Sequence, residues 1–390
     1  MTLDPRAADA VDALLEAAVA SGDVPNAVVV AADDHGPVYE GAAGPLTVGA
    51  PAAVTPDSVF RIASMTKMVT TVLALQQSEV GALDLQAPVA TYLSAFADLP
   101  VLDGFHGDVP RLRPAATQAT VAQLLTHTSG LAYWFWNADV LRYERETGTA
   151  NVLAGTLDAF SAPLVADPGT RFEYGTSTDW LGRVVEMVAG ARLDVVAARD
   201  VLGPLGMHST GFRLTEELRA RSVPVHRRRP DGSWAPTRID WAPDRAWESG
   251  GHGLYSTPRD YLRFQRMLLG SGTLEGATLL RPGTVDAAFR DQLGGLEVPA
   301  RVRTAHPASS CDFVPGPGHT WGHGLLLNTL DQPGRRAAGS GAWAGINNTF
   351  FWVDPASRLT GALHSQSLPF LEPGVVRLYQ DVERALYAGR

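Results

Sequence analysis

The chain has very little lysine and cysteine: its 390 residues include one of each, Lys67 and Cys311. A single cysteine excludes an intrachain disulfide framework and a cysteine-based metal site. All the other basic residues, out of 32 in total, are arginine. Arginine can replace lysine where only positive charge is needed, but a guanidinium keeps its proton at any accessible pH. The one lysine is therefore a candidate for a position where an amine must act as a base.

Positive charge is also scarce overall, since the formal net charge is −9. This balance argues against a nucleic-acid partner, which needs a basic face. The basic run Arg227–Arg229 is followed by Pro230-Asp231-Gly232, which predicts a solvated hairpin tip. The N-terminus lacks the basic start and apolar core of a signal peptide, and no run is long enough to span a membrane. We therefore expect a cytoplasmic protein without a membrane partner.

The two ends of the chain carry matching strand and helix patterns. A helix is predicted over residues 7–20, with strands over 26–32 and 38–43 after it. Near the C-terminus, strands are predicted over 346–353 and 359–365, and a helix over 375–387. The section between them is mostly helical with long loops. The expected fold class is mixed α/β (α+β): an antiparallel sheet flanked by helices. Residues 1–63 and 301–390 would form a discontinuous α/β domain, residues 64–300 a mostly helical domain, and the active site would lie between them.

Lys67 lies in a helical pattern together with a serine. Met65, Met68, Val69 and Val72 have the spacing of one buried helix face. Ser64 and Lys67 are three residues apart, so their side chains are neighbours on that helix. Ser64 lies near the helix start, where free N–H groups favour an oxyanion. A serine hydroxyl needs a neighbouring base to become a nucleophile, and a half-buried lysine of lowered pKa can be that base.

Other catalytic signatures are missing. No serine is centred in Gly-x-Ser-x-Gly, and there is no Gly-x-Gly-x-x-Gly, phosphate-binding loop or His-Glu-x-x-His. His319 and His323 are four apart, but the surrounding Gly and Pro disfavour a helix there. We therefore expect neither a metal nor a cofactor.

The stretch Ser64-Met65-Thr66-Lys67 resembles the Ser-x-x-Lys motif of β-lactamases and penicillin-binding proteins. Further landmarks resembling class C β-lactamase-like proteins follow in the family's order. They are Leu124–Leu131, Pro168-Gly169 with Phe172-Glu173-Tyr174, Pro204–Met207 and Ser249–Leu254. The resemblance covers about residues 10–385 and implies the β-lactamase/transpeptidase-like fold.

Two departures from the family pattern narrow the expected activity. The second motif, usually Tyr-x-Asn, reads Tyr174-Gly175-Thr176, so the asparagine is missing. The third, usually Lys-Thr-Gly on an edge strand, corresponds to Trp343-Ala344-Gly345, so the usual carboxylate partner is missing too. A Trp-x-Gly third motif is instead similar to family VIII carboxylesterases and related acyl-transferring esterases.

Carrying the family's roles to the matching positions makes Ser64 the nucleophile that accepts the acyl group. Lys67 and Tyr174 would share the proton transfers, with the order left open. The backbone N–H groups of Ser64 and Ile346 would form the oxyanion hole, and Gly345 would let substrate approach closely.

An aromatic run, Tyr133-Trp134-Phe135-Trp136, directly follows the His127 segment. Four consecutive aromatic side chains cannot all face one core, so part of the run either forms an apolar wall of the acyl pocket or packs between domains. Trp343 could close the opposite side, and His252 is expected in a loop near the site. The expected substrate-binding set is thus Tyr133, Trp134, Trp136, His252, Trp343 and Gly345.

These observations predict a serine hydrolase that cleaves carboxylic esters of small molecules through an acyl-enzyme on Ser64. The alternatives are an acyltransferase that passes the acyl group to an alcohol or amine, a β-lactamase or D-amino-acid peptidase, and a ligand-binding module without turnover. The expected partner is a small-molecule ester; the sequence does not indicate an oligomeric state.

Overall fold

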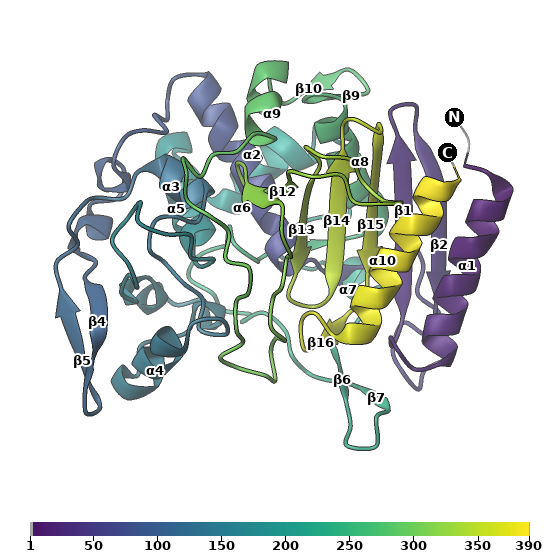
Figure 1. Cartoon of the computed structure of the whole chain (residues 1–390), viewed down its shortest axis with the longest axis horizontal. Coiled ribbons are helices and arrows are strands. Elements are labelled where there is room, and N and C mark those ends of the chain that lie inside the picture. The colour runs from purple at the N-terminus through teal and green to yellow at the C-terminus, as the bar shows by residue number, and fades with distance from the viewer. Residues whose placement is uncertain (1–2, 390) are drawn as a thin grey trace.

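The centre of the molecule is a seven-stranded sheet in the order β11-β12-β13-β14-β15-β1-β2 (Figure 1). The computed structural model describes residues 3–389. All neighbouring strands of this sheet are antiparallel, and β1 pairs with β15. Strands from both ends of the chain therefore form one antiparallel sheet, as predicted. The strands are β1 (Ala27–Asp33), β2 (Pro37–Ala43), β11 (His319–Trp321), β12 (Leu326–Asn328), β13 (Gly341–Gly345), β14 (Thr349–Asp354) and β15 (Leu359–His364).

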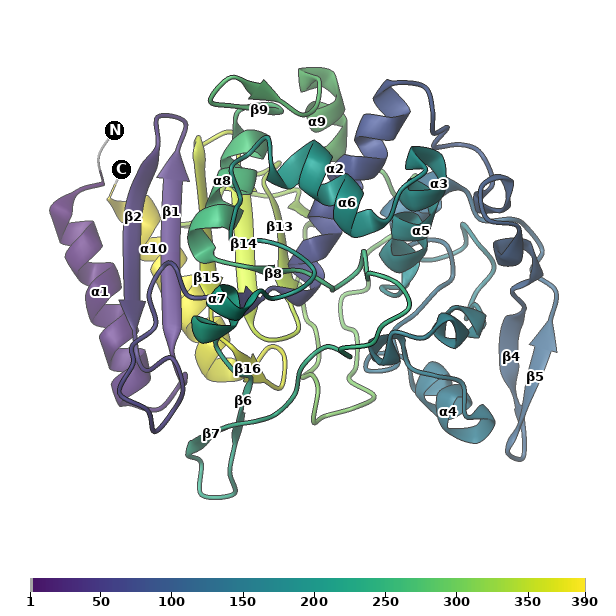
Figure 2. The ribbon, with the colours of Figure 1, turned by 180° about the vertical axis from the view of Figure 1, so that it is seen from behind.

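Helices cover both faces of the sheet. The terminal helices α1 (Pro5–Ala20) and α10 (Pro373–Ala388) lie side by side over one face (Figure 1). On the other face, α8 (Pro258–Leu269) packs against β1, β14 and β15 (Figure 2). Burial on both faces explains why β1 is apolar along its length instead of alternating.

The section between the two chain ends is mostly helices and loops. Its longer helices are α2 (Thr66–Glu79), α4 (Ala138–Thr147) and α5 (Ser177–Ala189), and its shorter ones are α3 (Val121–Leu125), α6 (Leu193–Ala197), α7 (Glu216–Ala220) and α9 (Pro282–Ala288). Short strand pairs also occur: β3 (Phe60–Arg61) with β8 (Tyr255–Ser256), β4 (Val101–His106) with β5 (Val109–Arg113), β6 (His226–Arg228) with β7 (Trp234–Pro236), and β9 (Thr273–Leu274) with β10 (Ala277–Thr278). A further short strand, β16 (Ser367–Leu368), pairs with β6. The boundaries at 63/64 and 300/301 remain a prediction.

The strand expected over 346–353 is wrong at its start. β14 begins at Thr349, and residues 346–348 form the turn that joins it to β13, with Asn348 at φ +64°. The aromatic run after Thr349 obscured the Asn347-Asn348 pair, whose short polar side chains favour such turns. Trp343–Gly345 lie within β13, which has neighbours on both sides, but β12 pairs with β13 only as far as Ala342. The Trp343–Gly345 edge is therefore left without a strand partner on that side.

Within residues 3–389, no helix combines the length and apolar character needed to cross a membrane.

Candidate active site

Ser64 lies in a single 3₁₀ turn, Ala63–Met65, immediately before α2. Ala63, just before it, has φ +45°, a strained conformation for a residue with a Cβ. The segment is fixed by hydrogen bonds to both flanks: the Tyr261 hydroxyl donates to the Met65 carbonyl (2.9 Å), and the Leu254 N–H donates to Thr66 Oγ1 (3.1 Å). The serine is thus held in a defined turn at the start of a buried helix.

Lys67 is buried one helical turn after Ser64, with 1% of its surface exposed. Its Nζ lies 3.2 Å from Ser64 Oγ, 2.9 Å from Tyr133 Oη and 2.8 Å from the Gly251 carbonyl oxygen. The Tyr133 hydroxyl itself donates to Asp179 Oδ2 (3.3 Å). Both Tyr133 Oη and the Gly251 oxygen must therefore accept hydrogens from Lys67.

Burial lowers the pKa of Lys67 to about 7, and the nearby Asp179 carboxylate opposes that shift. A neutral amine has two hydrogens and one lone pair. With both hydrogens directed to Tyr133 and Gly251, the lone pair faces the Ser64 hydroxyl. The amine can then accept the serine proton, which no arginine could do.

Tyr174, in the loop before α5, lies beside Ser64 and Lys67. Its oxygen accepts a hydrogen bond from Trp343 Nε1 (2.9 Å), and its ring lies 4.9 Å from Lys67 Nζ. Burial raises the pKa of Tyr174, while hydrogen bonds with Ser64 and Trp343 act in the opposite direction. The structure thus brings together the predicted Ser64, Lys67 and Tyr174.

The His127 segment holds the Tyr174 loop in place. The Glu173 N–H donates to the His127 carbonyl (2.8 Å), the Tyr133 N–H donates to the Tyr174 carbonyl (3.2 Å), and the His127 ring packs 4.6 Å from the Tyr174 ring. Burial lowers the pKa of His127 well below its usual value, so the ring stays neutral. Its position is that of a packing residue behind Tyr174.

Sequence reasoning missed the polar support beneath Lys67. Asp179, on α5, accepts hydrogen bonds from the Ser249 hydroxyl and from the Gly251 N–H (3.0 Å), besides the one from Tyr133. The carboxylate therefore binds the N–H of the same residue, Gly251, whose carbonyl accepts from Lys67. Asp179 is the fifth residue after Tyr174, and this short spacing was the available signal for it.

β13 closes the site on the sheet side. Gly345 lies so close to the Ile62 carbonyl that a Cβ would overlap that oxygen. Thr349 Oγ1 donates to the same carbonyl (3.3 Å), and Asn347 Nδ2 donates to the Arg61 carbonyl (3.3 Å). The turn that carries Ile346 is thereby held against the Ser64 segment, and both residues line one pocket.

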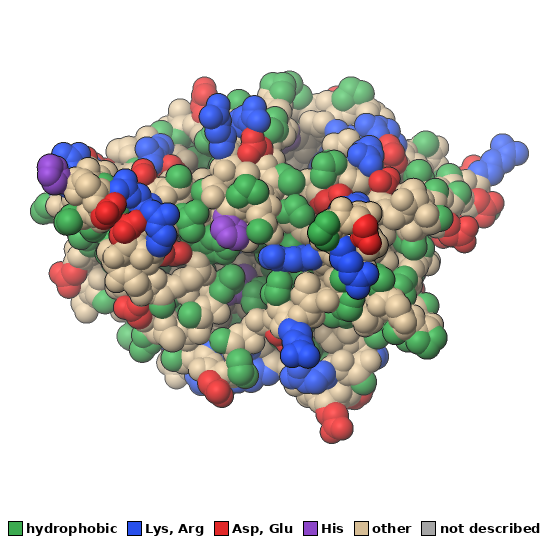
Figure 3. Space-filling model, turned by 90° about the horizontal axis from the view of Figure 1, so that it is seen from below, with side chains coloured by type: hydrophobic (Ala, Val, Ile, Leu, Met, Phe, Trp, Pro, Cys, Tyr) green, Lys and Arg blue, Asp and Glu red, His purple; other side chains and the backbone are tan. Residues whose placement is uncertain are grey.

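This pocket has a cavity volume of about 310 Å³. Seen from below, this side of the molecule shows histidine side chains near its middle, between hydrophobic and arginine side chains (Figure 3). Most of the lining is apolar or aromatic, and the rest is polar. The apolar or aromatic lining residues are Tyr133, Trp134, Phe135, Val152, Leu153, Ile239, Trp241, Ile346 and Leu368; the polar ones are Arg61, Ser64, Arg227, His252, His306, Ser309 and Asn347.

The predicted substrate-binding set is only partly present in this pocket. Tyr133, Trp134 and His252 line it, whereas Trp136, Trp343 and Gly345 do not. Trp136 packs against Tyr174 and Phe313, Trp343 lies between Tyr174 and Trp321, and Gly345 abuts the Ile62 carbonyl. Trp136 is thus packed among other aromatic rings, and packing between domains remains a prediction for it. A linear run of aromatics could not reveal which rings turn inward.

The prediction that Arg227–Arg229 lie at a solvated hairpin tip is only partly correct. Residues 226–236 form the predicted hairpin, with Arg228 paired to Glu372 (3.0 Å). Arg227, however, lines the pocket, and within residues 3–389 its guanidinium has no hydrogen-bond or ion-pair partner. Arg61, whose guanidinium lies 3.8 Å above the Trp241 ring, is a second cation there. Within the same residues, no cluster of three metal-ligating side chains is present.

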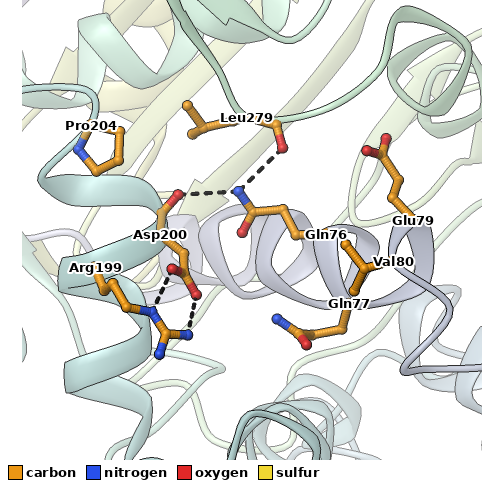
Figure 4. A pocket seen from close by; sticks show the side chains of 8 residues that line it. All are labelled: Gln76, Gln77, Glu79, Val80, Arg199, Asp200, Pro204 and Leu279. Atoms are coloured by element: carbon orange, nitrogen blue, oxygen red, sulfur yellow. Dashed lines mark hydrogen bonds and ion pairs between the residues drawn. The ribbon is translucent and has the colours of Figure 1, made fainter.

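Another hollow, of about 500 Å³, lies at the far end of α2 (Figure 4). Its polar groups largely bond to one another: Gln76 Nε2 donates to the carbonyls of Asp200 (3.1 Å) and Leu279 (3.2 Å), and Arg199 pairs with the Asp200 side chain. None of its eight lining residues is a serine, cysteine, threonine, lysine or histidine. Of these two hollows, the pocket at Ser64 is the one that contains the candidate nucleophile.

Comparison with known proteins agrees with this geometry. The Beta-lactamase family model matches residues 11–386. The chain is 30% identical to monacolin J acid methylbutanoyltransferase of Aspergillus terreus, covering 95% of this chain and 93% of the relative. It is 32% identical to lovastatin esterase of Penicillium rubens, covering 90% of each. Among solved structures, simvastatin synthase from Aspergillus terreus (LovD6 mutant) superposes with a TM-score of 0.84 at 27% identity, covering 98% of this chain and 95% of the other.

The family match spans nearly the whole chain, and the architecture is that of the matched structures. With homologues that are acyltransferases and an esterase, the chain belongs to the β-lactamase family and is a serine hydrolase or acyl-transferring enzyme of that fold.

Proposed function

We propose that this enzyme cleaves carboxylic esters of small molecules through an acyl-enzyme on Ser64. The observation that carries the proposal is the 3.2 Å approach of Lys67 Nζ to Ser64 Oγ, with both other partners of the amine acting as acceptors. This arrangement leaves the amine lone pair for the serine proton.

In the acylation step, Ser64 Oγ attacks the ester carbonyl while Lys67 takes its proton. The backbone N–H groups of Ser64 and Ile346 stabilise the oxyanion, each contributing about 10²–10³ in rate. Tyr174, which hydrogen-bonds with Ser64, transfers a proton to the departing alcohol oxygen and takes back the proton that Lys67 received from Ser64. The bond between the acyl carbon and the alcohol oxygen then breaks, and the acyl group remains on Ser64.

The pocket suggests the class of ester. Trp134, Phe135 and Trp241 give it large apolar walls, which favour a substrate with an apolar body. Arg61 and Arg227 add positive charge, so a carboxylate on that body would have a counter-ion. We infer that apolar esters, with or without a carboxylate, are better substrates than small polar ones.

Acyl transfer to an alcohol is the second candidate. The apolar walls that accept the alcohol part of an ester can equally accept an incoming alcohol, since the two occupy the same place before and after acyl exchange. The resemblance to monacolin J acid methylbutanoyltransferase favours this candidate, and the resemblance to lovastatin esterase favours hydrolysis.

Incubation with a nitrophenyl butyrate ester, followed by intact-mass spectrometry, tests the proposal. We expect an acyl adduct on Ser64 that Ser64→Ala lacks. Adding apolar alcohols and quantifying new ester against free acid then separates transfer from hydrolysis. Absence of an adduct in folded protein, with a fluorophosphonate probe as well, would leave a binding module without turnover. Faster hydrolysis of a chromogenic cephalosporin than of the ester would indicate a β-lactamase or peptidase.

A further inference from the structure

His252 is a pocket-lining histidine that the acylation step does not use. Its Nδ1 lies 2.7 Å from Ser249 Oγ, and its backbone N–H donates to the same oxygen (2.9 Å). The Ser249 hydroxyl in turn donates to Asp179 Oδ1. Asp179, Ser249 and His252 thus form a buried chain that leads from the support of Lys67 to the pocket.

The directions of the hydrogen bonds along this chain determine the tautomer of the imidazole. Ser249 has a single hydroxyl hydrogen, and the Asp179 carboxylate, which can only accept, takes it. Ser249 Oγ can then only accept from His252, so Nδ1 carries the ring hydrogen. In a neutral imidazole the other nitrogen, Nε2, then carries a lone pair.

The ring is neutral near neutral pH. Burial lowers the pKa of His252 to about 4, opposed by Asp179 and reinforced by Lys67, Arg61 and Arg245. A base of that strength resembles an ordinary carboxylate, which serves as a general base in many enzymes.

The Nε2 side of His252 belongs to the pocket that Ser64 also lines. Among residues 3–389 Nε2 has no hydrogen-bond partner, and it is not one of the polar atoms that are buried without a partner, so it opens onto the pocket that His252 lines. The Trp241 ring packs 4.9 Å from the imidazole and limits its rotation. The preceding residue, Gly251, contacts Lys67 through its carbonyl (2.8 Å). His252 is therefore held next to the Ser64–Lys67 pair.

We propose that His252 Nε2 is the general base of deacylation. In hydrolysis it takes the proton of the water whose oxygen attacks the acyl carbon, whereas attack by an alcohol is the reverse of acylation and uses Tyr174 and Lys67. A new carbon–oxygen bond forms, the bond from the acyl carbon to Ser64 Oγ breaks, and the proton passes from Nε2 to Ser64 Oγ. Ser249 and Asp179 position the imidazole and stabilise its cationic form in between.

This proposal rests on the acyl-enzyme of the proposed function, but the two fail separately. The experiment measures acylation as the burst of nitrophenol in the first turnover, and deacylation as the steady-state rate and the decay of the acyl-Ser64 mass. Without a burst, an acyl-Ser64 mass or fluorophosphonate labelling in the wild-type enzyme, the proposed function itself fails. With a burst, the histidine variants test deacylation alone.

For His252→Gln, we expect the burst rate to stay within about twofold, while steady-state turnover falls ~10²-fold and acyl-enzyme accumulates. Transfer to an added alcohol should stay within about twofold, because that step is the reverse of acylation and does not use His252. For Ser249→Ala, which releases Nδ1 but keeps the imidazole, we expect steady-state turnover to fall ~10-fold more than the burst rate does. Wild-type decay of the acyl-enzyme in His252→Gln would overturn the proposal, and so would equal losses of burst and turnover in both variants. If His252→Gln does not fold, the burst-to-turnover ratio of Ser249→Ala decides by itself.

Discussion

Lys67 Nζ lies 3.2 Å from Ser64 Oγ, and the two other atoms that it contacts can only accept hydrogens from it. This relationship connects proton transfer to the fold, because the acceptors come from two distant parts of the chain, Tyr133 after α3 and Gly251 before β8. Asp179 holds both of them. The geometry of the base therefore depends on how α2 and α5 pack together.

Lys67→Arg should retain the charge but lose acylation by ~10³-fold or more, because a guanidinium cannot accept the serine proton. Fluorophosphonate labelling of Ser64 measures this loss, and thermal unfolding shows whether the variant is folded. Labelling at the wild-type rate by the folded variant would refute the role of Lys67 as a base.

Acylation should rise with pH and level off above about 7, the pKa of Lys67, because the deprotonated amine is the active form. The Asp179 carboxylate raises that pKa, so Asp179→Asn should move the rise to lower pH. The rate of Ser64 labelling between pH 5 and pH 9 provides the profile. Glu275→Gln, at an exposed ion pair with Arg263, is the control and should leave it unchanged. A profile that is identical in the Asp179 variant would contradict this electrostatic account.

Trp343→Phe should slow acylation ~10-fold, since it removes the N–H that donates to Tyr174 Oη while keeping an aromatic ring. Tyr174→Phe removes the phenol hydroxyl itself and should lower the rate of acylation ~10²–10⁴-fold. Trp321→Phe is the matched control, because Trp321 Nε1 donates to the Leu125 carbonyl and not to Tyr174. Burst kinetics should separate the three variants. An equal loss of rate in both tryptophan variants would mean that packing, and not the hydrogen bond to Tyr174, matters.

Gly345→Ala should destabilise the fold by about 2 kcal/mol and reduce labelling of Ser64, because the new Cβ would overlap the Ile62 carbonyl. Gly36→Ala, in the turn between β1 and β2, meets no atom within 4 Å and should be neutral. Urea unfolding of both variants provides the comparison. Wild-type stability of the Gly345 variant would show that β13 can withdraw from the serine turn.

His364 should make the protein sensitive to acid. Burial lowers the pKa of His364 to about 3, and among the described residues, 3–389, both ring nitrogens are buried without a hydrogen-bond partner. The unfolded chain then binds the proton more readily, so the stabilisation present above the ordinary pKa of about 6.5 is lost as the pH falls. His364 alone should account for about 2 kcal/mol between pH 8 and pH 5. Chemical unfolding at pH 8 and at pH 5 should show that His364→Leu loses less of its free energy of unfolding at the lower pH than the wild-type protein does. An unchanged loss would assign the acid sensitivity to other groups.

The sequence by itself determined which residues to propose as nucleophile and base, because Ser64 and Lys67 are neighbours within one helical turn and the lone lysine stands out against an arginine-rich background. It also determined the sheet built from both chain ends, since short apolar runs bounded by turn residues indicate buried strands. Tyr174 could be identified through its place in the ordered motifs.

Tertiary structure decided everything that depends on contacts across the chain. Tyr133 and Gly251, far apart in sequence, meet at Lys67 because α2 packs between their segments. Which aromatic rings of the run 133–136 face the pocket follows from the path of a loop, which periodicity does not predict. Arg227, in the basic run of the hairpin, lines the pocket, and β14 begins three residues later than the predicted start at residue 346. Local spacing therefore predicts neighbours on one element, whereas burial, protonation and pocket shape arise only when distant elements pack together.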